Sequence, residues 1–303
     1  MKVGVNILNF GPGVNPSNLL RWAKTAESLG YHSVLISDHV AITPSVGQRY
    51  PEPYFDTFAS LAWLAGQTQR VQLGTTVCVL PYRHPILTAR LAANIDQLSG
   101  GRFIFGVGVG NAEDEFVALG LAHSRRGALA DECLRSILAL WTQNGRVSFQ
   151  GRLINFVEVA GIVPYQRPHP PIWVGGASEA ALRRVARFGD AWHPILRSLD
   201  SVGASLRDIR RQARELGRLE PFFTPRIRFD LREGPVAGER SLGIGSVEQV
   251  RADLKELERL GADHVVLDWH ARDLEATREH DRGLRALAVL AGEVLDLQNE
   301  RLR

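Results

Sequence analysis

The sequence contains little cysteine and no pattern of metal-binding side chains. Its 303 residues include two cysteines, Cys78 and Cys133, which lie far apart and outside any Cys-x-x-Cys or Cys/His spacing. We therefore expect neither a disulfide framework nor a structural zinc site. The nine histidines form no His-Glu-x-x-His motif, so no metal site is predicted. The absence of Gly-x-Ser-x-Gly argues against a serine hydrolase.

Long apolar segments are absent as well. No run reaches the roughly 18 apolar residues that a membrane-spanning helix needs, and the first residues read as a strand rather than as a secretory leader. We therefore expect a cytoplasmic protein that does not contact membranes. Lysine occurs only at positions 2, 24 and 255, and the net charge of +3 comes from arginines scattered among acidic residues. This pattern does not predict a nucleic-acid groove.

What the sequence does contain is a regular alternation of apolar strand-like runs and amphipathic helical patterns. The helical patterns, such as 19–29, 86–98 and 247–260, each end close to a glycine. The runs that suit buried parallel strands are 3–8, 33–37, 71–77, 103–109, 172–174, 191–193, 226–230 and 264–268. This order predicts an α/β fold, a (β/α)8 TIM barrel in one domain over residues 1–303, in preference to a doubly wound sheet.

One connection is longer than the others, and we interpret it as an insertion between strands 4 and 5, at about residues 111–170. Within it, 121–141 has a helical pattern, and 146–159 alternates around Gln150-Gly151 as a β-hairpin does. We expect the substrate to lie under this insertion.

In a (β/α)8 barrel the active site lies where the strands end and the βα loops begin. His39, after the second strand, is the best candidate for proton transfer, because histidine titrates near neutral pH. Asp38 is placed to orient His39 or hold its charge, although Asp-His at a strand end is also a common turn pair. His193, after the sixth strand, is a second catalytic candidate, with a packed loop as the alternative.

The segment GVGVGN, residues 106–111, superficially resembles a dinucleotide-binding loop. Asn111 stands where the last glycine would fall and no acidic residue follows at the expected distance, so the sequence does not support that function. Glycines at alternate strand positions instead leave room for a flat ring or for close backbone contact. Glu113, Asp114 and Glu115 follow, and we interpret them as favouring a helix N-terminus rather than as catalytic acids.

The stretch 171–192 combines a buried strand, a glycine pair and an amphipathic helix. The glycines allow a tight turn, and free amides at a helix N-terminus attract phosphate or another anion. The alternative is an ordinary βα turn in which glycine serves packing alone. The residues of this candidate anion site are Gly175, Gly176 and the N-cap Ser178, with Arg183 and Arg184 one turn later.

Three segments together resemble the bacterial luciferase-like superfamily of flavin and deazaflavin oxidoreductases. They are SDHV at 37–40, LGTTVCVLPYRHPILTARLAANIDQLSGGRFIFGVGVG at 73–110 and PIWVGGASEAALRRVARFGDAW at 171–192. The match covers most of the chain, and its middle segment is the most specific.

The resemblance implies a barrel that binds a flavin-type ring, either coenzyme F-420, a 5-deazaflavin, or FMN. It places His39 near the reactive ring edge, a non-proline cis peptide at Thr76-Val77 behind the ring, and the ribityl phosphate at the glycine turn. It also implies a homodimer. The expected cofactor-binding residues are Asp38, His39, Thr75, Thr76, Val77, Gly108, Asn111, Gly175, Gly176, Ser178 and Trp192.

Asn111 departs from the family pattern. F-420 dehydrogenases of this family that use a carboxylate proton donor carry glutamate at this position, and asparagine cannot donate that proton. His39 or His193 would replace the acid, or solvent would complete the protonation. The leading hypothesis is F-420-dependent hydride transfer to or from a small organic substrate. The alternatives are an FMN-dependent monooxygenase and a non-catalytic flavin-binding protein.

Overall fold

The computed structural model describes residues 1–269 and 277–303. Its central sheet is parallel throughout and runs in the order β10-β12-β15-β1-β2-β3-β5-β8-β9-β11, with β4 (Cys78–Val79) beside β5. Eight βα steps build it, as the sequence predicts. The main strands are β1 (Lys2–Ile7), β2 (Ser33–Ile36), β3 (Gln72–Thr75), β5 (Phe103–Gly108), β8 (Ile172–Gly175), β9 (Ala191–His193), β12 (Arg226–Arg228) and β15 (His264–Asp268).

The sheet closes into a barrel through two interrupted strands. The sixth consists of β9 and β10 (Ile195–Leu196), and the seventh of β11 (Phe222–Phe223) and β12. Pro194 and Pro225 stand at the two interruptions, because proline has no N–H for the ladder. β9 pairs with β11, β10 with β12, and β12 with β15, which returns to β1. The predicted (β/α)8 barrel is therefore confirmed.

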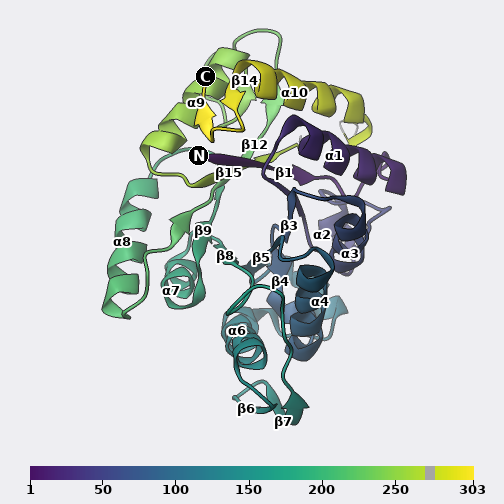
Figure 1. Ribbon diagram of the computed structural model, residues 1–303, viewed down its shortest axis with the longest axis vertical. Coiled ribbons are helices and arrows are strands. Elements are labelled where there is room, and N and C mark those ends of the chain that lie inside the picture. The colour runs from purple at the N-terminus through teal and green to yellow at the C-terminus, as the bar shows by residue number, and fades with distance from the viewer. Residues whose placement is uncertain (270–276) are drawn as a thin grey trace.

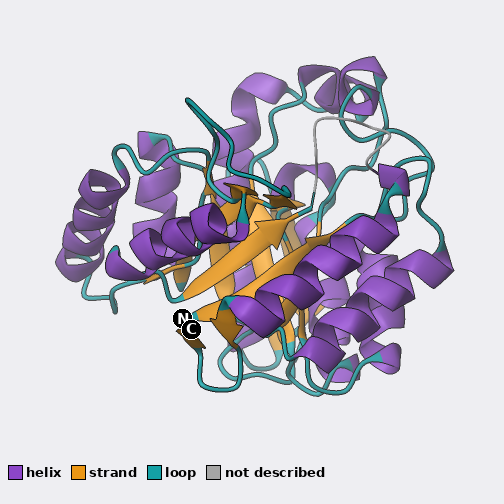
Figure 2. Ribbon diagram, turned by 90° about the horizontal axis from the view of Figure 1, so that it is seen from above, coloured by secondary structure: helices purple, strands orange, loops and turns teal. Residues whose placement is uncertain are grey.

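Helices surround the barrel on its outer side (Figures 1 and 2). The glycine-terminated patterns form helices close to the predicted bounds. No described helix is long and apolar enough to span a bilayer. The helices are α1 (Pro16–Leu29), α2 (Pro44–Gly47), α3 (Thr57–Gln67), α4 (Pro85–Leu98), α5 (Glu113–Ala118), α6 (Arg126–Thr142), α7 (Glu179–Phe188), α8 (Val202–Glu215), α9 (Val247–Arg259) and α10 (His280–Glu293).

The insertion contains the predicted hairpin, formed by antiparallel strands β6 (Arg146–Gln150) and β7 (Asn155–Ala160). The helix predicted at 121–141 begins later, with α6, because a 3-10 turn precedes it. The buried Glu132 carboxylate of α6 accepts hydrogen bonds from the backbone N–H groups of residues 152–154 and so fastens the hairpin turn. The hairpin projects beyond α6, away from the barrel axis (Figure 1).

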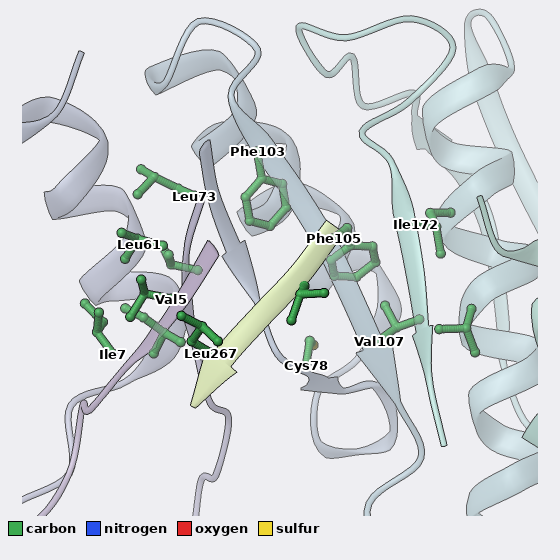
Figure 3. Packing of buried hydrophobic residues seen from close by; sticks show 14 of the residues in the cluster. Val5, Ile7, Leu61, Leu73, Cys78, Phe103, Phe105, Val107, Ile172 and Leu267 are labelled. Atoms are coloured by element: carbon green, nitrogen blue, oxygen red, sulfur yellow. The ribbon is translucent and has the colours of Figure 1, made fainter. Parts of the chain in front are cut away.

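Alternate residues of each strand face two different layers, as the period of a β-strand requires. Val34 and Ile36 belong to the main apolar layer between strands and helices, whereas Leu35 faces the small cluster inside the barrel. Figure 3 shows part of the main layer, in which Leu61 of α3 lies near Val5 and Ile7 of β1.

Polar side chains fill much of the remaining barrel interior. Asn6 Nδ2 donates to Asp268 Oδ1 at 2.7 Å, and Ser33 Oγ lies 2.9 Å from His264 Nε2. Arg226 also lies inside, with 5% of its surface exposed. Buried polar groups are costly unless they are hydrogen-bonded, so these contacts constrain the interior more tightly than apolar packing alone would.

Candidate active site

A cavity of about 260 Å³ opens at the carboxyl ends of the barrel strands. This volume lies near the lower limit of small-molecule sites, which span roughly 300–1,000 Å³. Its wall consists of Ser37, Asp38, His39, Tyr50, Thr76, Val77, Val79, Tyr82, Gly108, Val109, Gly110, Asn111, Gly175, Gly176, His193, Ile195 and Arg226. Asn111 is the one residue of the insertion among those that line this wall, and the expectation that the substrate lies under the insertion stays a prediction.

Nine of the predicted site residues meet in this cavity. They are Asp38, His39, Thr76, Val77, Gly108, Asn111, Gly175, Gly176 and His193. Their convergence follows from the parallel barrel, which brings the carboxyl ends of all its strands to one face.

Three other predicted residues, Thr75, Ser178 and Trp192, lie outside the cavity wall. Thr75 Oγ1 on β3 donates a hydrogen bond of 2.5 Å to the Gly106 carbonyl on the neighbouring strand β5. Trp192 Nε1 donates to the Gly176 carbonyl at 2.8 Å. Both side chains face away from the cavity and hold the backbone that forms it.

The glycine turn before α7 has the predicted form. Gly176 adopts a φ of 98°, which favours glycine, and the Ser178 side chain caps the helix by accepting from Ala181 N. Arg184, however, does not face this turn. Its buried guanidinium donates to Asp131 Oδ1 of α6 at 2.6 Å, so its suggested support for an anion here is wrong.

The strand predicted at 71–77 ends early, because β3 stops at Thr75 and the Thr76–Val77 peptide is cis, as the family resemblance implies. The Val77 side chain then packs against two glycines. A Cβ on Gly108 would lie 2.5 Å from Val77 Cγ2, and one on Gly175 would lie 3.2 Å from Val77 Cγ1. These glycines therefore allow the close contact that projects Val77 into the cavity wall.

Asp38 does not orient His39 as the sequence suggests. Its carboxylate accepts two hydrogen bonds from the Arg83 guanidinium, both at 2.8 Å, and a third from Val79 N at 2.9 Å. This bidentate geometry uses both carboxylate oxygens. Asp38 thus holds the βα loop that follows the third strand. The Arg83 guanidinium balances its negative charge at the cavity wall.

The partner of His39 is Glu115, which lies 76 residues further along the chain. Glu115 Oε2 is 2.7 Å from His39 Nδ1, and its other oxygen accepts from the backbone N–H groups of Val40 and Ala41. Tyr82 Oη donates to Oε2 at 2.9 Å. The His39 ring packs on Tyr50 with centroids 4.5 Å apart. Since a carboxylate only accepts, Nδ1 carries a proton, and Nε2 has no hydrogen-bond partner among the described residues.

Glu115 is ionised despite being fully buried. Burial by itself raises the pKa of its carboxyl, but the hydrogen bonds from His39, Val40 and Tyr82 hold that pKa below its ordinary value. The acidic run does open a helix, as the sequence predicts, but Glu115 is buried there and bonds to His39, which the sequence did not predict.

His193 uses both ring nitrogens within the protein. Nδ1 contacts the Thr224 carbonyl and must therefore donate, so Nε2 accepts the Thr76 hydroxyl proton at 2.9 Å. Burial, with a smaller effect from the Arg226 charge, lowers the pKa of His193 to about 4. This geometry argues against the predicted catalytic role of His193.

The low pKa of His193 predicts acid sensitivity. The unfolded histidine binds a proton near pH 6.5 and the folded one only near pH 4, so this contribution to stability is complete above pH 6.5 and declines as the pH falls toward 4. The expected slope is about 1.4 kcal/mol per pH unit. Urea unfolding at pH 6.5, 5.5 and 4.5 should show a steeper decline for the wild type than for His193→Gln. Parallel declines would contradict the prediction.

The cavity also contains a buried polar group that suits a ligand. Ser37 is 5% exposed, and its Oγ has no hydrogen-bond partner among the residues that the structure describes. Four glycines, Gly108, Gly110, Gly175 and Gly176, also line the cavity. An unsatisfied hydroxyl and a flat backbone surface fit a planar heterocycle with hydrogen-bonding edges. In the described ranges, no three His, Cys, Asp or Glu residues are placed to hold a metal ion.

Comparison with known proteins agrees with this geometry. The family model described as luciferase-like monooxygenase matches residues 1–231. The chain belongs to this family. An F-420-dependent glucose-6-phosphate dehydrogenase of Nakamurella multipartita is 34% identical over 231 residues, which cover 71% of the chain and 64% of that relative. Members of the family thus include enzymes with different cofactors and reactions.

Two solved structures share the fold of this luciferase-like protein. Monooxygenase RslO1 from Streptomyces bottropensis superposes with a TM-score of 0.80 at 23% identity, covering 96% of this chain and 98% of that one. The oxygenating constituent of 3,6-diketocamphane monooxygenase from Pseudomonas putida, in complex with FMN, gives 0.78 at 17% identity, covering 97% of each chain. The family is one of flavin- or F-420-dependent oxidoreductases and monooxygenases.

Proposed function

We propose that this luciferase-like protein is an F-420-dependent oxidoreductase acting on a small alcohol or carbonyl compound. The observation that supports this best is that His39, at the cavity wall, is held through Nδ1 by Glu115 while its Nε2 has no partner in the described part of the chain. When bound, F-420 would supply the hydride chemistry at its C5 carbon. The relative from Nakamurella multipartita, an F-420-dependent glucose-6-phosphate dehydrogenase at 34% identity, is consistent with this choice.

The proposed proton transfer needs one group that both accepts and donates near pH 7. His39 Nε2 would accept a hydroxyl proton when an alcohol is oxidised and return it when a carbonyl is reduced. Glu115, ionised and held by backbone donors, would stabilise the protonated ring and keep Nδ1 turned away from the ligand. His39 would thus replace the acid that Asn111 cannot supply.

The residues that would hold the ring are those of the cavity floor and wall. Ser37 and Thr76 offer hydroxyls, and Val77 with the strand-end glycines offers a flat packing surface. The ribityl phosphate would lie at the N-terminus of α7, where Gly176 and Ser178 present the first turn.

Titration of the purified protein with F-420 and, separately, with FMN tests the proposal. We expect F-420 to bind at micromolar concentration with a change in ring fluorescence. A Gly176→Val variant should bind at least about tenfold more weakly, because valine disfavours a positive φ and fills the turn. The control is Gly217→Val, because Gly217 also has a positive φ but lies away from the site. Failure of the wild type to bind F-420 would refute the proposal.

An FMN-dependent monooxygenase is the second candidate, because two monooxygenases share the fold. The aromatic and aliphatic side chains of Tyr50, Val79, Val109 and Ile195 at the cavity suit the exclusion of water that this chemistry also requires. Substrate-dependent oxygen uptake with reduced FMN, together with no binding of F-420, would favour this candidate.

A further inference from the structure

A buried ion pair lies beneath the cavity and belongs to the barrel interior. Arg226 reaches the cavity wall from β12, whereas its partner Asp268 stands at the end of β15 and is not part of that wall. Arg226 Nε and Nη2 both donate to Asp268 Oδ2, at 2.9 and 2.7 Å. The positive member of the pair therefore faces the cavity and the negative member lies behind it.

Arg226 is also the first donor in a chain of hydrogen bonds with a fixed direction. Its Nη1 donates to the Thr76 carbonyl at 2.6 Å and to Thr76 Oγ1 at 3.2 Å. Thr76 in turn donates to His193, which donates to the Thr224 carbonyl. A guanidinium group cannot accept a hydrogen bond and a backbone carbonyl cannot donate one. Every hydrogen bond in this series therefore keeps the same donor and the same acceptor.

Arg226 is the one charged side chain in this series of hydrogen bonds, and Asp268 is its counter-charge. His193 stays neutral because it is buried, and the Asp38 charge at the wall is matched by Arg83. Because Arg226 is buried, its charge is screened less by salt and water than an exposed charge would be.

We infer that Arg226 and Asp268 are positioning residues that together set the relative affinity of the site for the reduced and oxidised ring. This inference rests on the flavin-type cofactor of the proposed function. Reduction adds negative charge to the pyrimidine part of a flavin or deazaflavin, and charge near the ring tunes its electronics. Arg226 favours the reduced ring, and Asp268 limits that preference.

The two charges predict opposite effects, which a role in stability alone would not produce. In Arg226→Gln, the ratio of the dissociation constants of reduced and oxidised ring should rise by about tenfold, equivalent to roughly 30 mV for a two-electron couple. In Asp268→Asn, the same ratio should fall by a similar factor, because the guanidinium loses its counter-charge. Arg226→Lys should keep the ratio near that of the wild type.

Equilibrium redox titration of the complexes with FMN and with F-420, whichever the wild type binds, measures this ratio. The pair Arg240–Asp253 is likewise joined by two hydrogen bonds but lies outside the cavity wall, so Arg240→Gln and Asp253→Asn are matched controls. Shifts of the same sign in Arg226→Gln and Asp268→Asn, or shifts no larger than the controls, would overturn the inference.

Two further outcomes are informative. If Arg226→Gln does not fold, Asp268→Asn and Arg226→Lys still test the inference. An unchanged ratio of the two dissociation constants in Asp268→Asn refutes it. If the wild type binds neither FMN nor F-420, the proposed function fails and the inference fails with it. Binding with unchanged ratios refutes the inference alone.

Discussion

Replacement of His39 with glutamine is expected to lower kcat by roughly 10²- to 10⁴-fold, the usual contribution of a general acid or base. Glutamine keeps a polar side chain of similar reach but cannot exchange a proton near pH 7. Because the ring would be held by other groups, such as Ser37 and the glycine turn, the affinity for F-420 should change little. The loss should therefore fall on the chemical step rather than on cofactor binding.

The measurement is turnover followed by F-420 absorbance, with any alcohol or ketone that the wild type converts, at several pH values. His169→Gln is the matched control, since His169 is also partly buried but bonds to Pro170 outside the cavity wall. A His39→Gln variant with more than about a tenth of wild-type kcat would exclude a proton-transfer role of the usual size.

Replacement of Glu115 with alanine is expected to destabilise the fold by at least about 1–3 kcal/mol, the cost of leaving one buried donor without its acceptor. Four donors lose their acceptor together: His39 Nδ1, Tyr82 Oη and the N–H groups of Val40 and Ala41. Leaving buried donors unsatisfied costs about 1–3 kcal/mol each when water cannot replace the acceptor. The segment from Val40 onward should lose its anchor on α5 at the same time.

Urea unfolding at pH 7 measures this loss as a lower midpoint. Glu115→Gln should be destabilised less, because its amide oxygen still accepts from the backbone, yet its kcat should fall since the amide no longer stabilises a protonated His39. Glu179→Ala, at an exposed position on α7, should stay within about 0.5 kcal/mol of the wild type. A loss below about 1 kcal/mol in Glu115→Ala would show that the carboxylate is dispensable for the fold.

The location of the site could be predicted because local patterns encode it. Strand-like and helical runs alternate, and a parallel barrel must bring every strand end to one face, so Asp38, His39 and Gly175 had to converge. Ser178 was identified as an N-cap for a similarly local reason, since its hydroxyl reaches an amide three residues away.

The partners of the charged side chains could not be predicted in the same way. Asp38 stands next to His39 in sequence but bonds to Arg83, and His39 bonds to Glu115 from another βα connection. Adjacent strand-end residues point to different sides, so sequence neighbours often do not face each other. Glu115 belongs to the same acidic run as Glu113 and Asp114, so the sequence does not separate the three residues. Only the burial of Glu115 in the folded protein distinguishes it.

The sequence by itself determined the barrel, the face that carries the site and the glycine turn before α7, because each depends on periodicity or on backbone freedom within a few residues. Only the tertiary structure decided which charges neutralise one another and which histidine keeps a free nitrogen. Those pairings join residues on different strands and loops, and they depend on the register and closure of the barrel, which no local pattern contains. For that reason His39 and Glu115 form a pair at the cavity, while His193 is held between Thr76 and Thr224.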